Sequence, residues 1–139
     1  MKKFIIIVMI LSVLTSVSYI LLKRTPEKIL LNQLEFDLTD FNYDIIYSKE
    51  EWSPNGDGYY LAQIKFNEIT KENIDYIKSQ KFHKLPIDVI LSPNDIPPKW
   101  ENKKEGYFKL KYFDKDVRNF KILFLDIDKK ELLIYYQLE

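Results

Sequence analysis

The chain has 139 residues, no cysteine, one histidine, and 21 basic against 21 acidic residues. The lack of cysteine excludes disulfides and thiolate chemistry, and a single histidine leaves too few ligands for a zinc site. Four of the basic residues (Lys2, Lys3, Lys23 and Arg24) flank the first apolar segment, which leaves 17 basic against 21 acidic residues and a net charge of −4. Such a balance argues against a nucleic-acid partner.

The first segment predicts a membrane anchor over residues 1–24. Phe4 to Leu22 is a run of 19 positions without charge, which as a helix spans about 28 Å, close to the thickness of a bilayer core. The membrane is thus the first expected partner, through residues 4–22. A cleaved signal peptide ending near Ser16–Ser18 is the alternative, but apolar residues resume at Tyr19.

The orientation of this single pass is predicted from the lysines that precede it. Lys2 and Lys3 are followed at once by the apolar run, an order typical of an export signal. Long C-terminal domains also cross membranes largely regardless of flanking charge. We therefore expect the domain on the extracytoplasmic side.

The rest of the chain divides into a linker at 25–40 and a compact domain at 41–139. Thr25, Pro26 and Glu27 are typical of a helix start, with a cap, a proline at the first position and an acid in the first turn. A short helix through Leu34 is expected to connect the anchor to the domain.

The domain opens with a predicted β-hairpin. Residues 41–48 alternate, which places the side chains of Phe41, Tyr43, Ile45 and Tyr47 on one face, and residues 59–67 repeat the pattern. The segment 53–58 between them is rich in turn-forming residues.

One helix and further strands complete the prediction. Thr70 is expected to cap a helix to about residue 81, with Ile74 and Ile77 facing the sheet. Residues 85–91 are a short edge-strand candidate, because Pro86 argues against a central strand. Residues 107–113, 118–126 and 131–138 read as a meander of three strands, with Phe108, Leu110 and Tyr112 inward in the first. The fold class is therefore α+β: a transmembrane helix, then an antiparallel sheet of about five strands with one packed helix.

The turn at 53–58 supplies weak candidates for a metal ligand. Asn55 and Asp57 match ligand positions of a calcium-binding EF-hand loop, and Gly58 matches its glycine. Ser53 and Ile64, however, stand where that loop needs its terminal carboxylates. A plain hairpin turn is the expectation, and no cofactor is predicted.

Catalytic residues are not apparent in the sequence. His83 is the only histidine and follows the predicted helix, where an imidazole favours the negative end of the helix dipole. Carboxylates such as Asp126 and Asp128 fall at predicted turns or strand ends, where acids are ordinarily solvated. No catalytic residue is assigned.

The loop at 92–105 contains Pro97, Pro98 and Trp100, which form a candidate partner-binding segment because tryptophan is enriched in interface hot spots. The alternative is that Trp100 folds back as a lid on the sheet. The sequence thus predicts a membrane-tethered, non-enzymatic binding module. Besides the membrane, a protein is the partner considered for it. A small envelope hydrolase using surface carboxylates and a structural envelope component are the alternatives.

Overall fold

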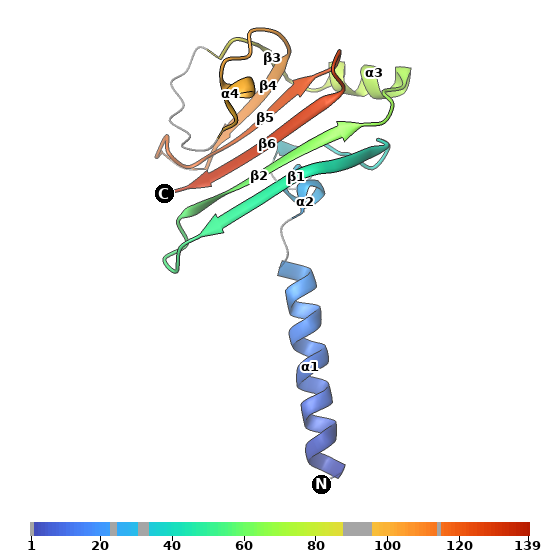
Figure 1. Ribbon diagram of the computed structural model, residues 1–139, viewed down its shortest axis with the longest axis vertical. Coiled ribbons are helices and arrows are strands. Elements are labelled where there is room, and N and C mark those ends of the chain that lie inside the picture. The colour runs from blue at the N-terminus through green and yellow to red at the C-terminus, as the bar shows by residue number, and fades with distance from the viewer. Residues whose placement is uncertain (1, 23–24, 31–33, 88–95, 114) are drawn as a thin grey trace.

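The structure is a computed structural model that describes residues 2–22, 25–30, 34–87, 96–113 and 115–139 (Figure 1). Its centre is an open sheet of six antiparallel strands in the order β1-β2-β6-β5-β4-β3. The strands are β1 (Tyr43–Trp52), β2 (Gly58–Phe66), β3 (His83–Lys84), β4 (Tyr107–Tyr112), β5 (Phe120–Asp126) and β6 (Glu131–Leu138). The α+β class is confirmed, whereas the expected count of five strands is wrong.

The order of the strands departs from a simple meander at one position. The β1–β2 hairpin and the run β4-β5-β6 have the predicted connections, but β2 pairs with β6, from Gly58 opposite Leu138 to Lys65 opposite Glu131. This pairing places β5 and β6 in the interior of the sheet. Both strands are apolar on both faces, as central strands require.

The sixth strand is not the edge candidate predicted at 85–91. β3 consists of His83 and Lys84, which pair with Phe108 and Tyr107, and the described residues that follow, Leu85 to Ile87, are not in a strand. Residues 88–91 of that prediction lie outside the described residues. Pro86 has no backbone N–H to donate, which is one reason for the pairing to stop before it.

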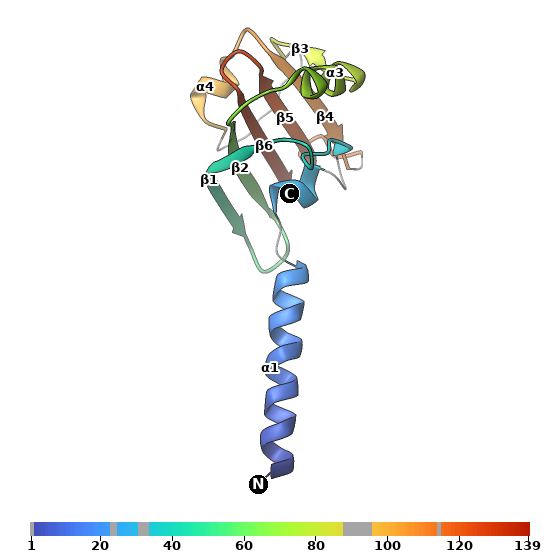
Figure 2. The same cartoon turned by 90° about the vertical axis from the view of Figure 1, so that its right-hand side faces the viewer.

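Two hydrophobic cores cover the two faces of the sheet. One core contains Leu123, Leu125, Leu132 and Ile134 with apolar side chains from residues 29–30 and 34–41 and from α3 (Lys71–Ser79). The other contains Ile122, Phe124, Leu133 and Tyr135 with Trp100 of α4 (Pro98–Glu101). Figure 2 shows α3 and α4 on opposite sides of the sheet. Alternate residues of β5 and β6 therefore pack into the two cores on opposite faces of the sheet.

The helix α3 begins where the sequence predicts. The Thr70 hydroxyl accepts from the Asn73 backbone N–H at 3.2 Å, and the Asn73 side chain accepts from the Thr70 N–H at 3.0 Å, which completes a capping box. Asn73 also donates to the Asp40 carbonyl at 3.0 Å. Because Ile77 is buried on the sheet, α3 is fixed at both its start and its inner face.

The segment expected as a linker contributes to the core. Thr25 caps the short helix α2 (Pro26–Ile29), and the Tyr43 hydroxyl of β1 donates to the Glu27 carboxylate. Five apolar side chains that the structure describes in this segment are buried, and they are Ile29, Leu30, Leu34, Phe36 and Leu38. This stretch therefore packs with the sheet that it precedes.

The helix α1 (Lys2–Leu22) projects away from the sheet (Figure 1). Its side chains are described from Ile6 to Tyr19, and all of them are exposed. Among the residues described, no helix is both long enough and apolar enough to cross a bilayer. The transmembrane span predicted from the sequence is therefore not confirmed.

Candidate functional site

The strand β1 forms one edge of the sheet, and its two ends differ in how they pack. Tyr43 and Trp52, at its termini, pack against the core that contains α3, while the residues between them are mostly exposed. The register with β2 shifts between Ile45 and Tyr47, so that Ile46 has no partner on β2. This irregularity is a β-bulge, which bends an edge strand and re-aims its side chains.

The bulge exposes three consecutive apolar residues. Ile45, Ile46 and Tyr47 are 46%, 53% and 48% exposed. Tyr47 lies opposite Gln63, between two β2 residues of the α3-side core, so it points to the face opposite Tyr43 and Ile45. The predicted common face of Phe41, Tyr43, Ile45 and Tyr47 is therefore wrong for Tyr47, because the extra residue shifts the alternation.

Charged residues flank these apolar side chains. We call residues 44–51 the β1 edge; all of them are exposed except Lys49, which is half-buried. Lys49 pairs with Glu51 at 2.9 Å and lies over the Tyr59 ring. The pKa of Lys49 is raised above its ordinary value, mainly by contact with the Tyr59 hydroxyl and secondly by the ion pair with Glu51.

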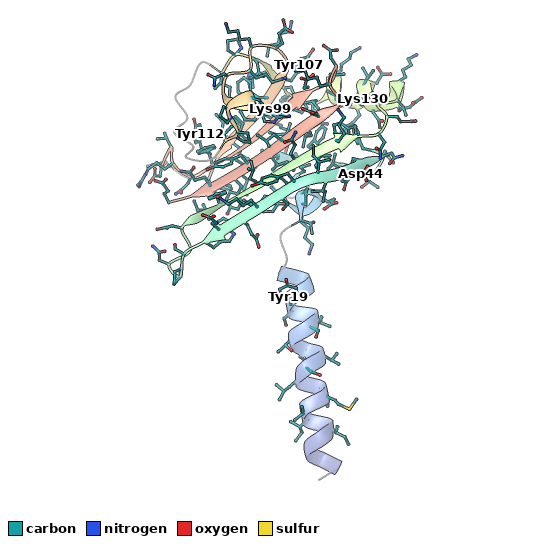
Figure 3. All side chains as sticks on the ribbon, viewed as in Figure 1. Tyr19, Asp44, Lys99, Tyr107, Tyr112 and Lys130 are labelled. Atoms are coloured by element: carbon teal, nitrogen blue, oxygen red, sulfur yellow. The ribbon has the colours of Figure 1, made fainter. Side chains whose placement is uncertain are left out.

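The two remaining carboxylates of the β1 edge face solvent. Asp44 lies at the start of the strand (Figure 3) and opposite Lys65. The Lys65 ammonium is instead directed to the Lys129 carbonyl at 2.6 Å and to Glu131 at 3.8 Å. Within the described part of the chain, neither Asp44 nor Glu50 forms an ion pair. The β1 edge thus combines an apolar centre with acidic ends.

Comparisons with known proteins do not identify a function for this surface. The chain matches no protein-family model, no curated protein and no solved structure. The possible roles of the β1 edge and of the other candidate residues therefore follow from their geometry alone.

The turn at 53–58 uses its polar groups internally. The Ser53 backbone N–H donates to the Asp57 carbonyl at 2.8 Å, and the Asn55 amide donates to the Asp57 carboxylate at 2.6 Å. The Ser53 hydroxyl donates to the Asn55 side-chain oxygen. Across the residues that the structure describes, no cluster of three or more metal-ligating His, Asp or Glu side chains occurs. The positions of Asn55 and Asp57 suit a closed turn better than a cation site.

The candidate binding segment around Trp100 is only partly accessible. Trp100 is 1% exposed and packs on Phe124, with the Lys103 ammonium 5.2 Å from its ring centre. Pro98 is exposed and Pro97 is half-buried. An anchor for a partner needs accessible aromatic surface, so this arrangement favours the alternative in which Trp100 is a lid on the sheet.

A cavity of about 460 Å³ lies beside the β5–β6 turn and is lined by several charged residues. Its lining includes Asp126, Asp128, Lys103 and Lys129. Burial alone would raise the pKa of Asp126, but hydrogen bonds from the Lys103 ammonium and the Lys129 backbone N–H outweigh burial and lower the pKa below its ordinary value. A general acid for hydrolysis needs a raised pKa, so Asp126 gives the hydrolase alternative no support.

A second hollow, of about 500 Å³, lies at the turn end of β1 and β2. Its polar side chains are linked to one another: the Tyr135 hydroxyl donates to Gln137 at 2.8 Å, and the Gln137 amide donates to Glu139 at 2.8 Å. Glu139 in turn lies 3.5 Å from the Arg118 guanidinium. This network ties the end of β6 to the β4–β5 connection.

His83 takes a place at the opposite edge of the sheet. It is an exposed residue of β3, and its ring lies 5.4 Å from that of Phe108.

Sequence reasoning missed the β1 edge, although one signal was present: the adjacent Ile45 and Ile46 interrupt an otherwise alternating strand. Two successive apolar residues at that point are a sign of a bulge.

Proposed function

We propose that this protein is a membrane-tethered, non-enzymatic binding module that engages a partner protein through the β1 edge. One observation carries the proposal: an edge strand of 10 residues exposes three consecutive apolar side chains, Ile45, Ile46 and Tyr47. Edge strands present unpaired N–H and C=O groups that a partner strand can bind, while side chains provide specificity.

The charges around the apolar centre support a specific interaction rather than non-specific association. Natural proteins protect exposed edges with bulges and charged residues, because a long, flat, apolar edge promotes aggregation. The β1 edge has both devices, and its three apolar residues remain exposed between them. A patch that is apolar in the centre and charged at the rim is typical of a binding surface.

The tether is supported by the sequence of α1. The uncharged run from Phe4 to Leu22 is bracketed by Lys2–Lys3 and Lys23–Arg24, and lysine and arginine side chains reach the interfaces of a membrane. We propose a single pass with the sheet domain on the extracytoplasmic side.

Site-specific photo-crosslinking in cells tests the proposed function. A photoreactive amino acid replaces Tyr47 in the full-length chain, and the matched control carries it at Val117, which is 68% exposed in the β4–β5 connection. We expect a discrete protein adduct from position 47 that is absent from position 117. Adding Ile46→Asp should remove that adduct without lowering the amount of protein.

Two results would contradict the proposal. The first is the absence of any protein adduct at position 47. The second is the same set of adducts at both positions, because it would show that capture reflects exposure rather than a specific surface.

A further inference from the structure

The identity of the partner segment can be narrowed from the charges and register of the β1 edge. This inference rests on the proposed function, because it describes what the same edge binds. The edge has three carboxylates, Asp44, Glu50 and Glu51, against the single ammonium of Lys49. Lys49 and Glu51 neutralise each other at 2.9 Å, so Asp44 and Glu50 are the carboxylates left for a partner.

The bulge fixes how a partner strand meets these two carboxylates. Asp44 and Glu50 are six positions apart on β1, but their partners on β2, Lys65 and Tyr60, are only five apart, because Ile46 is left out of the pairing. A strand on the outer side of β1 that follows the same pleat also advances by five residues. Two basic residues five positions apart then lie opposite Asp44 and Glu50.

A spacing of five positions also places the two basic side chains on the same faces of the sheet as Asp44 and Glu50. Asp44 shares its face with Lys65 and Glu50 shares its face with Tyr60, and these β2 residues lie on opposite faces because they are an odd number of positions apart. Side chains five positions apart on a regular strand also point to opposite faces. Between them, the partner needs apolar or β-branched residues to cover Ile45, Ile46 and Tyr47.

A second copy of this chain fits the β1 edge poorly. Antiparallel pairing of β1 with itself has a two-fold axis perpendicular to the sheet, which would turn the α1 of the second copy to point the opposite way (Figure 1). Two tethered copies could not then enter one membrane from the same side. Self-pairing also brings together two edges that are both acidic.

We infer that the β1 edge binds an extended protein segment that has two basic residues five positions apart around an apolar centre. The partner adds a seventh strand to the sheet, and its two cations neutralise Asp44 and Glu50. The backbone hydrogen bonds of such a strand supply affinity, and the charge spacing supplies specificity.

Synthetic peptides of 10 residues, the length of β1, test the inference against the full-length chain in detergent micelles. The first peptide has two lysines five positions apart with valine and isoleucine between them. The second has glutamate in place of both lysines, and the third has its lysines four positions apart. Fluorescence anisotropy measures each dissociation constant at low salt, where exposed charges are least screened.

We expect the first peptide to bind about tenfold more tightly than the second, because two favourable charge pairs replace two repulsive ones. It should also bind more tightly than the third. The double variant Asp44→Lys/Glu50→Lys should reverse the preference, whereas Val117→Asp should leave it unchanged. Both sets of substitutions are at exposed residues, so the variants should fold.

Any one of three results would overturn the inference. They are equal affinity for the three peptides, tighter binding of the glutamate peptide, and no binding of any peptide at about 1 mM. If position 47 still gives a discrete protein adduct in cells, the β1 edge remains a binding surface and only the assignment of its partner fails. If that adduct is absent as well, the proposed function fails with it.

Discussion

The ion pair between Lys103 and Asp126 should determine how firmly the segment that carries α4 is held on the sheet. The two side chains are 14% and 9% exposed, and the Asp126 carboxylate also accepts from the Lys129 backbone N–H at 2.9 Å. Asp126→Asn keeps an oxygen for Lys129 but leaves the Lys103 ammonium without its counterion. We expect this substitution to destabilise the domain.

The size of the loss follows from burial. Removing one partner of a fully buried ion pair costs about 3–5 kcal/mol. Lys103 is less than fully buried and lies over the Trp100 ring, so we expect about 2–3 kcal/mol at pH 7. For residues 25–139, this corresponds to a decrease in Tm of roughly 10 °C.

The pH dependence provides a second signature. The folded pKa of Asp126 is lowered, so the unfolded chain takes up this proton at a higher pH than the folded chain does. The contribution of Asp126 is therefore fully present above its unfolded pKa of about 4 and is lost as the pH falls through its folded pKa. The difference between the native protein and Asp126→Asn should shrink below about pH 4.

Urea and thermal unfolding of residues 25–139, followed by circular dichroism, measure these differences, provided that the fragment melts cooperatively as we expect. The control is Asp128→Asn, an exposed carboxylate on the same turn, which should change stability by less than about 0.5 kcal/mol. A similarly small loss for Asp126→Asn, or a loss that does not vary with pH, would refute the role assigned to this ion pair.

Three further predictions test the hairpin turn, the metal site and the tether. Gly58→Ala should lower stability by about 1–3 kcal/mol, because its new Cβ would lie 2.0 Å from the Glu51 carbonyl oxygen. Gly56→Ala should cost less in the same urea titration, because its Cβ meets no atom within 4 Å and only the positive φ of 96° opposes it. Calcium at about 1 mM should not raise the Tm of residues 25–139, although a site with a Kd near 10 µM would add about 2.7 kcal/mol; an increase abolished by Asp57→Ala would contradict this. Mass spectrometry should find the full-length chain in the membrane fraction with its N-terminus intact, and a mature N-terminus at Tyr19 or later would argue for a cleaved signal.

The local elements of this protein could be predicted from its sequence, because their signals are local. The capping pattern at Thr70 identified α3, and alternation together with short connections identified the β1–β2 hairpin and the β4-β5-β6 meander. The apolar character of both faces of β5, with Ile122 and Phe124 on one and Leu123 and Leu125 on the other, is also visible in the sequence and is typical of a central strand. In each case, the periodicity of the buried residues reports directly on the element that buries them.

How these elements are joined depends on contacts between segments that are distant in the sequence. The pairing of β2 with β6 brings together segments about 70 residues apart, and no local pattern specifies it. Trp100 is buried because α4 lies over Phe124, and Tyr112, expected inward, is 37% exposed near the end of β4. The β1 edge also depends on the tertiary structure. A strand is half-buried only where neighbouring elements cover it, and β1 is the last strand on its side of the sheet. The bulge at Ile46 then turns Tyr47 to the opposite face.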